Sequence, residues 1–314
     1  MKSYYLVPER IKLCDSLKAP QEGVIICDEK LLALYPELFD KSMAIYPLKA
    51  SEKTKSGETL ADIYEFLAKN KLRRSEIIQV LGGGITCDIA AFAAATFKRG
   101  CRLKLYPSTL LAMVDAALGG KSALNHLGQR NLIGSFYPAE AVIIYPEFLK
   151  SLPEMELRQG KAEMLKSYLL CNELSEVNLQ AGSIPNAEQI MEYALYKMRL
   201  CAEDPYDKGI RRLLNFGHSY GHVYETLLDY RYKHGDNVVM GIYSEVEQSY
   251  RKGYLPEADY QRIIEELDKY PLPEGLIRDV QDLDKEMVTR CLAQDKKQGG
   301  MVPIATGFRK VEVI

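Results

Sequence analysis

The chain has few histidines, no excess of charge and no long apolar run, and these shortages exclude several classes of function. Its 314 residues carry a formal net charge of −2, so neither nucleic acid nor an anionic membrane is expected as a partner. No apolar run is long enough to span a bilayer, and the N-terminal residues lack the apolar core of a signal peptide. The seven cysteines are scattered without a Cys-x-x-Cys pair, which indicates reduced thiols and a cytoplasmic protein.

The length and the order of the hydrophobic patterns predict two domains. In residues 1–151, short apolar runs alternate with helical patterns, which predicts a Rossmann-like α/β domain with a mostly parallel sheet. The expected strands are Gly23–Asp28, Ser42–Leu48, Glu76–Leu81, Arg102–Tyr106 and Ala141–Tyr145. The segments expected between them include Gly57–Asn70, Thr86–Lys98 and Thr109–Leu118.

In residues 152–314 the strand-like runs vanish and amphipathic helices dominate, which predicts a mainly α-helical second domain. The expected helices are Glu154–Glu173, Asn186–Glu203, Ile210–Leu228, Asn237–Arg251, Glu257–Lys269 and Asp284–Gln294. A short hairpin is expected at the end, formed by Met301–Thr306 and Arg309–Ile314.

Two stretches of the first half have the composition of anion-binding loops. Gly82, Gly83 and Gly84 follow a strand and precede a helix, where backbone N–H groups and the helix end favour a pyrophosphate. A tight strand–helix turn without a ligand is the alternative. Farther on, Lys121 and Arg130 stand in a polar stretch and could bind a phosphate, unless it is simply a solvated loop. His126, in the same stretch, is expected at the surface.

Three of the four histidines fall in one segment of the second half. His218 and His222 are four apart, so they share a face if the segment is helical. His234 lies just before Asp236, a plausible N-cap for a helix that starts at Asn237. Two imidazoles on one helix and a third at the next helix start can converge on one ion, because catalytic zinc usually takes three protein ligands. Ordinary satisfied histidines are the alternative.

Other polar residues accompany the histidines. Glu163 and Lys166 are three apart, and a carboxylate that faces inward needs a partner such as a divalent ion. An exposed intrahelical Glu–Lys pair is the common alternative. Arg211 and Asn215 precede His218 and His222 by seven residues each, so a continuous helix would place them on the same face.

Taken together, these motifs resemble those of the 3-dehydroquinate synthase family. The resemblance runs from about Glu52 to Lys297, and the motifs stand in the family's order. They are GGGITCDIAAF, RGCRLKLYPSTLLAMVDAALGGKSALN, GQRNLIGSFYPA, GKAEMLK, GIRRLLNFGHSYGH, HGD and DKK. The family converts 3-deoxy-D-arabino-heptulosonate 7-phosphate into 3-dehydroquinate and phosphate. The resemblance therefore implies a sugar phosphate substrate, NAD as cofactor, and Zn²⁺ or Co²⁺.

The resemblance also assigns roles to individual residues. The implied metal ligands are Glu163, His218 and His234. The implied cofactor residues are Asp28, Glu52, Lys55, Gly83, Gly84, Asp88, Thr109 and Lys121. The implied substrate-binding residues are Arg99, Lys121, Arg130, Asn131, Arg211, Asn215 and Lys296. The implied catalytic residues are Asp115, Lys166, Lys197, Asp207 and His222. Arg99 matches an arginine that reaches the substrate of a neighbouring subunit, which implies a homodimer.

Some positions depart from the family's usual residues, and other functions share its motifs. Arg130 stands where lysine is usual, Asp207 where glutamate is usual, and Lys30 where asparagine is common; these departures bear on affinity. The alternatives are another sugar phosphate cyclase, a metal-dependent polyol dehydrogenase, and a catalytically silent paralogue used for binding or regulation. Lys197 and Arg211 in the expected places favour the carboxylate-bearing heptulosonate.

Overall fold

The structure is a computed structural model, which describes residues 10–17, 22–40, 42–296 and 303–313. It divides into two compact units. The first consists of residues 1–153 and 186–205, and the second of residues 154–185 and 206–314. The sequence analysis placed the boundary between residues 151 and 152. It also assigned all later helices to the second domain, whereas residues 186–205 cluster with the first unit.

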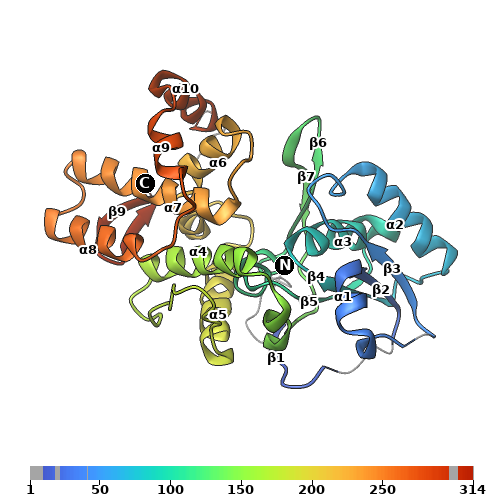
Figure 1. Ribbon diagram of the computed structural model, residues 1–314. Coiled ribbons are helices and arrows are strands. Elements are labelled where there is room, and N and C mark those ends of the chain that lie inside the picture. Colours follow the sequence, from blue (N-terminus) through green and yellow to red (C-terminus); the bar gives the residue numbers. More distant parts are fainter. Residues whose placement is uncertain (1–9, 18–21, 41, 297–302, 314) are drawn as a thin grey trace. The chain divides into compact units, whose positions relative to one another are not determined.

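The first unit is built on a six-stranded parallel sheet, as the alternating pattern predicted (Figure 1). In spatial order the strands are β1 (Ile11–Leu13), β8 (Ala141–Ile144), β5 (Arg102–Pro107), β4 (Ile77–Gly82), β2 (Val24–Asp28) and β3 (Ala44–Leu48). Every residue of β4 is buried, because a central parallel strand is covered on both faces. This is why apolar residues predominate here, with the buried Gln79 as an exception, instead of alternating with polar ones.

The helices of this unit connect and cover the strands. They are α1 (Glu29–Leu34), α2 (Gly57–Lys69), α3 (Gly84–Thr96) and α5 (Ala187–Glu203), with short 3₁₀ turns at Pro36–Leu38, Phe97–Arg99 and Pro146–Ser151 and a π-helical turn at Ala112–Ala116. The chain leaves β2 towards β3 on one side and β4 towards β5 on the other. Ligands of open α/β sheets bind at such a switch point, beyond the carboxyl ends of the strands.

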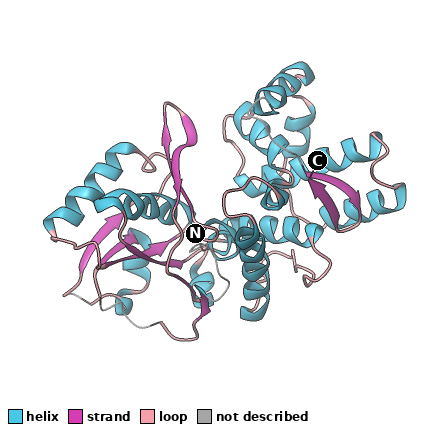
Figure 2. Cartoon of the chain, turned by 180° about the vertical axis from the view of Figure 1, so that it is seen from behind, coloured by secondary structure: helices cyan, strands magenta, loops and turns pink. Residues whose placement is uncertain are grey.

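A two-stranded antiparallel hairpin follows the π-helical turn and projects from the first unit (Figure 2). Its strands are β6 (Lys121–His126) and β7 (Gln129–Phe136). The sequence analysis interpreted the stretch of Lys121 and Arg130 as a polar loop, so the hairpin is a correction. Most residues of β7 are exposed, and its sequence therefore lacks the alternation by which a half-buried strand is recognised.

The second unit is mainly helical, as expected, and ends in a short hairpin. Its elements are α4 (Glu154–Leu170), a 3₁₀ turn η6 (Ile210–Asn215), α6 (His218–Leu227), α7 (His234–Arg251), α8 (Glu257–Asp268), α9 (Leu276–Gln281), α10 (Lys285–Lys296), β9 (Pro303–Gly307) and β10 (Lys310–Val313). Part of the hairpin predicted from Met301 lies outside the described residues. None of the helices in the described ranges is both long and apolar enough to cross a membrane.

Two helix predictions in the second unit are wrong in a way that affects the site. The expected single helix Ile210–Leu228 is broken at Phe216 and Gly217, where Gly217 adopts a φ of 80°. Arg211 and Asn215 therefore lie on a separate 3₁₀ turn and do not extend the helical face of the histidines. The next helix begins at His234 and not at Asn237, so Asp236 belongs to its first turn and is not its N-cap.

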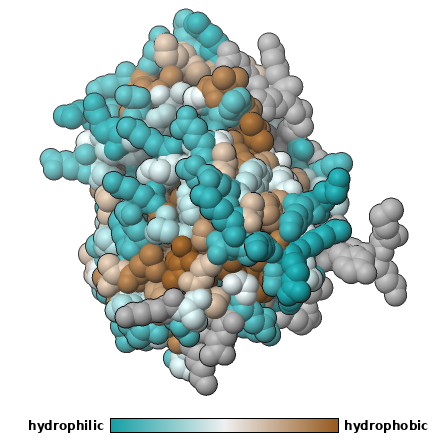
Figure 3. Space-filling view, turned by 90° about the vertical axis from the view of Figure 1, so that its right-hand side faces the viewer, coloured by the Kyte–Doolittle hydropathy of each residue, from teal (hydrophilic) through white to brown (hydrophobic). Residues whose placement is uncertain are grey.

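The surface shown in Figure 3 is mostly hydrophilic, and its apolar side chains form small separate groups. Scattered apolar residues of this kind are usual on globular proteins. The large aliphatic side chains of the central strands, among them Ile25, Ile26 and Ile78, are fully buried. The sheet of the first unit therefore forms a rigid support for the turns at its carboxyl edge.

Candidate functional site

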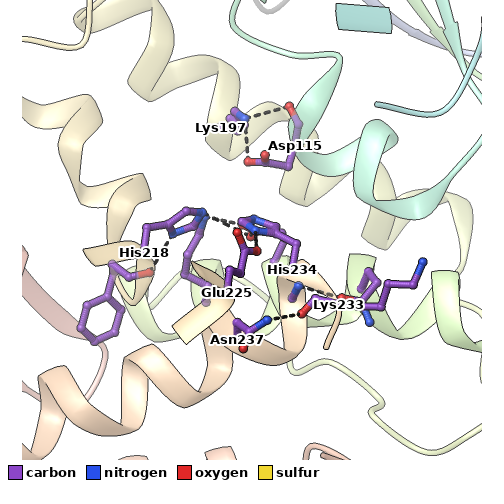
Figure 4. Close-up of polar contacts among 12 residues, drawn as sticks. Asp115, Lys197, His218, Glu225, Lys233, His234 and Asn237 are labelled. Carbon is purple, nitrogen blue, oxygen red and sulfur yellow. Dashed lines mark hydrogen bonds and ion pairs between the residues drawn. The ribbon is translucent and has the colours of Figure 1, made fainter. Parts of the chain in front are cut away.

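Three side chains of the second unit converge on a small space. Glu163 lies in the middle of α4, while His218 and His234 are the first residues of α6 and α7. Oε1 of Glu163 is 3.7 Å from Nε2 of His218 and 3.6 Å from Nε2 of His234. The two imidazole rings lie side by side, with their centroids 5.2 Å apart (Figure 4). The three residues predicted as metal ligands are thus brought together, although α4 is distant from the other two in sequence.

These distances fit a common cation better than they fit hydrogen bonds. A separation of 3.6–3.7 Å is too long for a hydrogen bond between a ring nitrogen and a carboxylate. Three ligand atoms at zinc bond lengths and tetrahedral angles would lie about 3.4 Å apart. Both carboxylate oxygens of Glu163 are buried; Oε2 is ion-paired with Lys166, and neither oxygen accepts a hydrogen bond of ordinary geometry from the described residues. A buried carboxylate in this condition is what a divalent ion would satisfy.

Nδ1 of each ring has a hydrogen-bond acceptor, and this contact orients Nε2 of the same ring. Nδ1 of His234 lies 2.8 Å from Oε1 of Glu225, and Nδ1 of His218 lies 3.2 Å from the carbonyl oxygen of Phe216. In the form that binds a metal, with a proton on Nδ1 and none on Nε2, the lone pair of Nε2 is directed at Glu163. Metal-binding histidines are usually oriented in this way, by a carboxylate or carbonyl behind the ring.

Glu225 is the functional residue that sequence reasoning missed. It is 4% exposed and lies two turns after His218 on the same helix. The only signal was its position, seven residues after His218, on the face that the histidines define. His222, which the spacing suggested as a ligand, is exposed and is not part of the Glu163 group. Together with Glu225 and His234 it forms a second group of possible ligand atoms.

Lys166 changes the electrostatics of the group formed by Glu163, His218 and His234. Its buried ammonium group forms an ion pair with Glu163, so the pair is not the exposed one that the sequence analysis kept as an alternative. Burial would raise the pKa of Glu163, but Lys166 and the two histidines hold that pKa well below its ordinary value. Burial and Lys166 hold the pKa of His218 well below its ordinary value, so this ring is neutral.

His234 behaves in the opposite way in the metal-free protein. Burial would lower its pKa, but the carboxylates of Glu163 and Glu225 outweigh this effect and raise the pKa to about 10. The imidazolium thus compensates the two acids that face it. A divalent cation would take over this role and displace the proton from Nε2, since metal binding requires the deprotonated nitrogen.

In the first unit, a buried lysine joins two predicted binding regions. Nζ of Lys55, 4% exposed, is 2.5 Å from Oδ2 of Asp88 and also contacts Oδ1 of Asn131. Burial raises the pKa of Asp88, and Lys55 opposes this effect. The resemblance assigns Lys55 and Asp88 to the cofactor and Asn131 to the substrate, and the structure places all three in one cluster.

The remaining cofactor residues of this unit lie around the carboxyl edge of the sheet. Asp28 ends β2, and its side chain caps α1 by accepting from the backbone N–H of Lys30. The turn of Gly83 and Gly84 joins β4 to α3, whose first N–H groups have no acceptor within the helix. Thr109 begins the next turn, and its hydroxyl accepts from the N–H of Ala112 at 3.1 Å.

The loop after β3 is tied to the β6–β7 hairpin. Asn125 donates to Oε2 of Glu52 at 2.8 Å, and Nε of Arg130 lies 4.0 Å from the same oxygen. Lys121 begins β6 and is exposed. The stretch that sequence reasoning interpreted as phosphate-binding is thus held by residues assigned to the cofactor.

Asp115 and Lys197 form a further pair within the first unit. Nζ of Lys197 is 2.6 Å from Oδ1 and 2.7 Å from the backbone oxygen of Asp115 (Figure 4). Lys197 is buried on α5, and Asp115 lies in the π-helical turn. Two of the predicted catalytic residues are therefore in direct contact.

The other predicted residues with described side chains lie in turns of the chain. Arg99 is exposed in a left-handed turn with a φ of 64°, next to Lys98 in the same conformation. Asp207, with a φ of 57°, precedes η6, on which Arg211 is buried and Asn215 is half-buried. The side chain of Lys296 lies outside the described residues.

Comparison with known proteins agrees with this geometry. Residues 45–159 match the family model "3-dehydroquinate synthase N-terminal", and residues 160–298 match "3-dehydroquinate synthase C-terminal". A 3-dehydroquinate synthase of Legionella pneumophila (strain Lens) is 37% identical over 273 residues, which cover 80% of this chain and 73% of the relative. One of Enterococcus faecalis (strain OG1RF) is 34% identical over 304 residues, which cover 92% and 84%.

Solved structures of sugar phosphate cyclases share the fold. A 2-epi-5-epi-valiolone synthase of Streptomyces hygroscopicus, with NAD⁺ and Zn²⁺ bound, has a TM-score of 0.79 at 22% identity and covers 97% of this chain and 86% of its own. A 2-deoxy-scyllo-inosose synthase with carbaglucose-6-phosphate, NAD⁺ and Co²⁺ has the same TM-score and identity, and covers 99% and 87%. With two family models that together match most of its residues, the chain belongs to the 3-dehydroquinate synthase family.

Proposed function

We propose that the protein converts 3-deoxy-D-arabino-heptulosonate 7-phosphate into 3-dehydroquinate and phosphate, with NAD and a divalent cation, Zn²⁺ or Co²⁺, as cofactors. The observation that carries the proposal is the group of Glu163, His218 and His234, in which both histidines are oriented from behind towards one buried carboxylate. Relatives with this activity in their names are 34–37% identical over most of the chain.

The two cofactors would supply chemistry that amino-acid side chains lack. When bound, NAD would supply a reversible hydride acceptor and the cation a Lewis acid for substrate hydroxyls, which would allow phosphate to leave and the ring to reclose without net redox change. The chain's own task is to bind, to orient and to move protons. Glu163, His218 and His234 would hold the cation in this scheme.

In the second unit, Lys166 and His222 are the groups that we assign to the substrate beside the cation. Lys166 is fixed by its buried ion pair with Glu163, and its ammonium group can donate to a hydroxyl or an alkoxide. His222 is exposed one turn after His218 and can reach a ligand that enters from solvent. We assign Asp207 to proton transfer, Arg211 to the carboxylate of the substrate, and Asn215 and Lys296 to further contacts.

In the first unit, we assign the anion-binding parts to the two phosphate-bearing molecules. The N-terminus of α3, at Gly83 and Gly84, would receive the pyrophosphate of NAD, because backbone N–H groups and the helix dipole favour negative charge there. Lys121 and Arg130 of the β6–β7 hairpin would bind the sugar phosphate, together with Asn131. The remaining cofactor contacts that we propose are Asp28, Glu52, Lys55, Asp88, Thr109 and Lys121.

Asp115 and Lys197 would work as a linked acid–base pair. Because the two groups lie in direct contact, we assign this pair to proton exchange with a substrate hydroxyl. We further infer a cytoplasmic homodimer. All seven cysteines are free in the structure, and the exposed Arg99 is available to a neighbouring subunit.

One assay tests the function. The purified protein is incubated with substoichiometric NAD, Zn²⁺ and heptulosonate phosphate, while phosphate release, NADH absorbance and the carbocyclic product are followed. We expect many phosphates per NAD, 3-dehydroquinate as the product and no accumulation of NADH. Turnover of sedoheptulose 7-phosphate or glucose 6-phosphate alone would indicate another cyclase. Steady NADH production would indicate a dehydrogenase, and no reaction with any sugar phosphate would indicate a silent paralogue.

A further inference from the structure

The residues after His234 make contacts that metal binding by itself does not explain. His234, Gly235 and Asp236 form the first turn of α7. The carboxylate of Asp236 is 1% exposed and accepts two hydrogen bonds from Arg158, at 3.0 Å from Nε and 2.9 Å from Nη2. It also accepts from the hydroxyl of Tyr270 at 2.8 Å. A buried, three-bonded carboxylate at the start of a helix is a fixed anchor.

Gly235 lies in equally close contact with α4. Its N–H donates to Oε1 of Gln159 at 2.7 Å. A Cβ added at Gly235 would lie 2.7 Å from Cβ of Ala162 and 2.9 Å from Oε1 of Gln159, closer than real Cβ contacts occur. The first turn of α7 is therefore pressed against α4 so tightly that only glycine fits.

The anchors on α4 and the metal ligand on α4 are parts of one helical surface. Gln159 and Glu163 are four residues apart and share a face, and Arg158 adjoins Gln159. Three consecutive residues of α7 thus meet this part of α4: Asp236 meets Arg158, Gly235 meets Gln159, and His234 faces Glu163. These two contacts lie directly beside the pair of ligands.

We propose that Arg158, Gln159, Gly235 and Asp236 are positioning residues, which lock α7 onto α4 and so hold His234 and Glu163 at metal-binding distance. The inference rests on the proposed function, since it takes the cation as given. It assigns a role to each residue of the His-Gly-Asp motif: His234 is a metal ligand, Gly235 allows α7 to pack closely on α4, and Asp236 binds Arg158. Metal bonds tolerate deviations of only about 0.2 Å, so a small movement of this turn is enough to weaken binding.

The test measures the metal and not only the reaction. Arg158→Gln removes the guanidinium and leaves a buried carboxylate that, among the described residues, keeps the hydrogen bond from Tyr270. We expect the affinity for Zn²⁺, measured by competition with a chromophoric chelator, to fall about 10- to 100-fold, as for other outer-shell partners of metal ligands. The visible absorption of the Co²⁺ form should change in position or intensity, because that absorption reports ligand geometry.

Arg309→Ala is the matched control in the same unit. Arg309 donates to the carbonyl oxygens of Tyr168 and Leu174 at 2.8 and 2.7 Å, near the far end of α4. Its loss should lower the melting temperature of the metal-free protein but leave Zn²⁺ affinity and the Co²⁺ spectrum unchanged. This control separates positioning of the ligands from general stability.

A second pair of variants keeps the test decisive if Arg158→Gln does not fold. Gln159→Leu removes one neutral acceptor and should weaken Zn²⁺ binding, whereas Gln159→Glu retains an oxygen for the N–H of Gly235 and should restore it. Wild-type affinity and spectrum in Gln159→Leu and Arg158→Gln would overturn the positioning proposal. The metal centre of the proposed function fails instead if the wild-type protein binds no Zn²⁺, or if its Zn²⁺ binding is unchanged in His218→Ala.

Discussion

The contact between Glu225 and His234 gives the sharpest prediction about the metal centre. Oε1 of the buried Glu225 lies 2.8 Å from Nδ1 of His234 and fixes which nitrogen faces Glu163. Glu225→Ala removes this acceptor, so the ring is free to turn or to place its proton on Nε2. Loss of such a partner weakens metal binding about 10- to 100-fold, or about 1.4–2.7 kcal/mol.

Glu225→Gln is the paired variant, because its amide oxygen still accepts from Nδ1 while the charge is lost. We expect its Zn²⁺ affinity to lie between those of the wild type and Glu225→Ala. The assay is chelator competition on freshly prepared metal-free protein, with circular dichroism to show that each variant is folded. If Glu225→Ala binds Zn²⁺ as tightly as the wild type, the orientation of His234 by Glu225 does not matter and the reasoning is refuted.

Three further predictions concern phosphate binding and stability. Lys121→Ala should raise the Michaelis constant for the sugar phosphate and slow phosphate release, and unchanged steady-state kinetics would remove Lys121 from the site. Lys55→Met leaves the partly buried Asp88 without its ion-pair partner, so urea denaturation should show a loss of about 1–3 kcal/mol together with weaker NAD binding; an unchanged midpoint contradicts this. Arg309→Ala should cost about 1–3 kcal/mol, because the guanidinium bonds one carbonyl in the last turn of α4 and another beyond it, and stacks on Tyr168; no shift in its melting temperature would argue against this role.

The regular elements of the fold were predictable because local sequence determines them. The buried strands β2, β4 and β8 are mostly apolar runs, and α5 begins at Ala187, one residue after the predicted start at Asn186. The helix break at Gly217 was not predictable from periodicity, because apolar residues continue on both sides of it. The break depends on α7, whose residue Glu245 accepts the N–H of Gly217.

The site shows the same division between local and distant causes. The positions of the three histidines indicated that all of them could converge on one ion, whereas in the structure His222 does not belong to the Glu163 group. The set of Glu163, His218 and His234 was predicted from the resemblance to a family. Glu225 and Arg158 stayed hidden, because each acts on a partner that only tertiary packing brings near.

The start of α7 illustrates why a correct residue can be given a wrong role. Asp236 is a good N-cap by residue type, but α7 begins at His234, two residues before Asp236, and so includes Asp236 in its first turn. There its charge meets Arg158 from another helix, a contact separated by 78 positions in the sequence. Propensity rules describe the turn, whereas the partner comes from the packing of α4 against α7.

The most direct test of the central claim is an anomalous difference map at the zinc absorption edge, from crystals of the protein grown with Zn²⁺. The account predicts one strong peak within about 2.3 Å of a carboxylate oxygen of Glu163 and of Nε2 of both His218 and His234. A map with no peak there, or with its strongest peak on other residues, would contradict it.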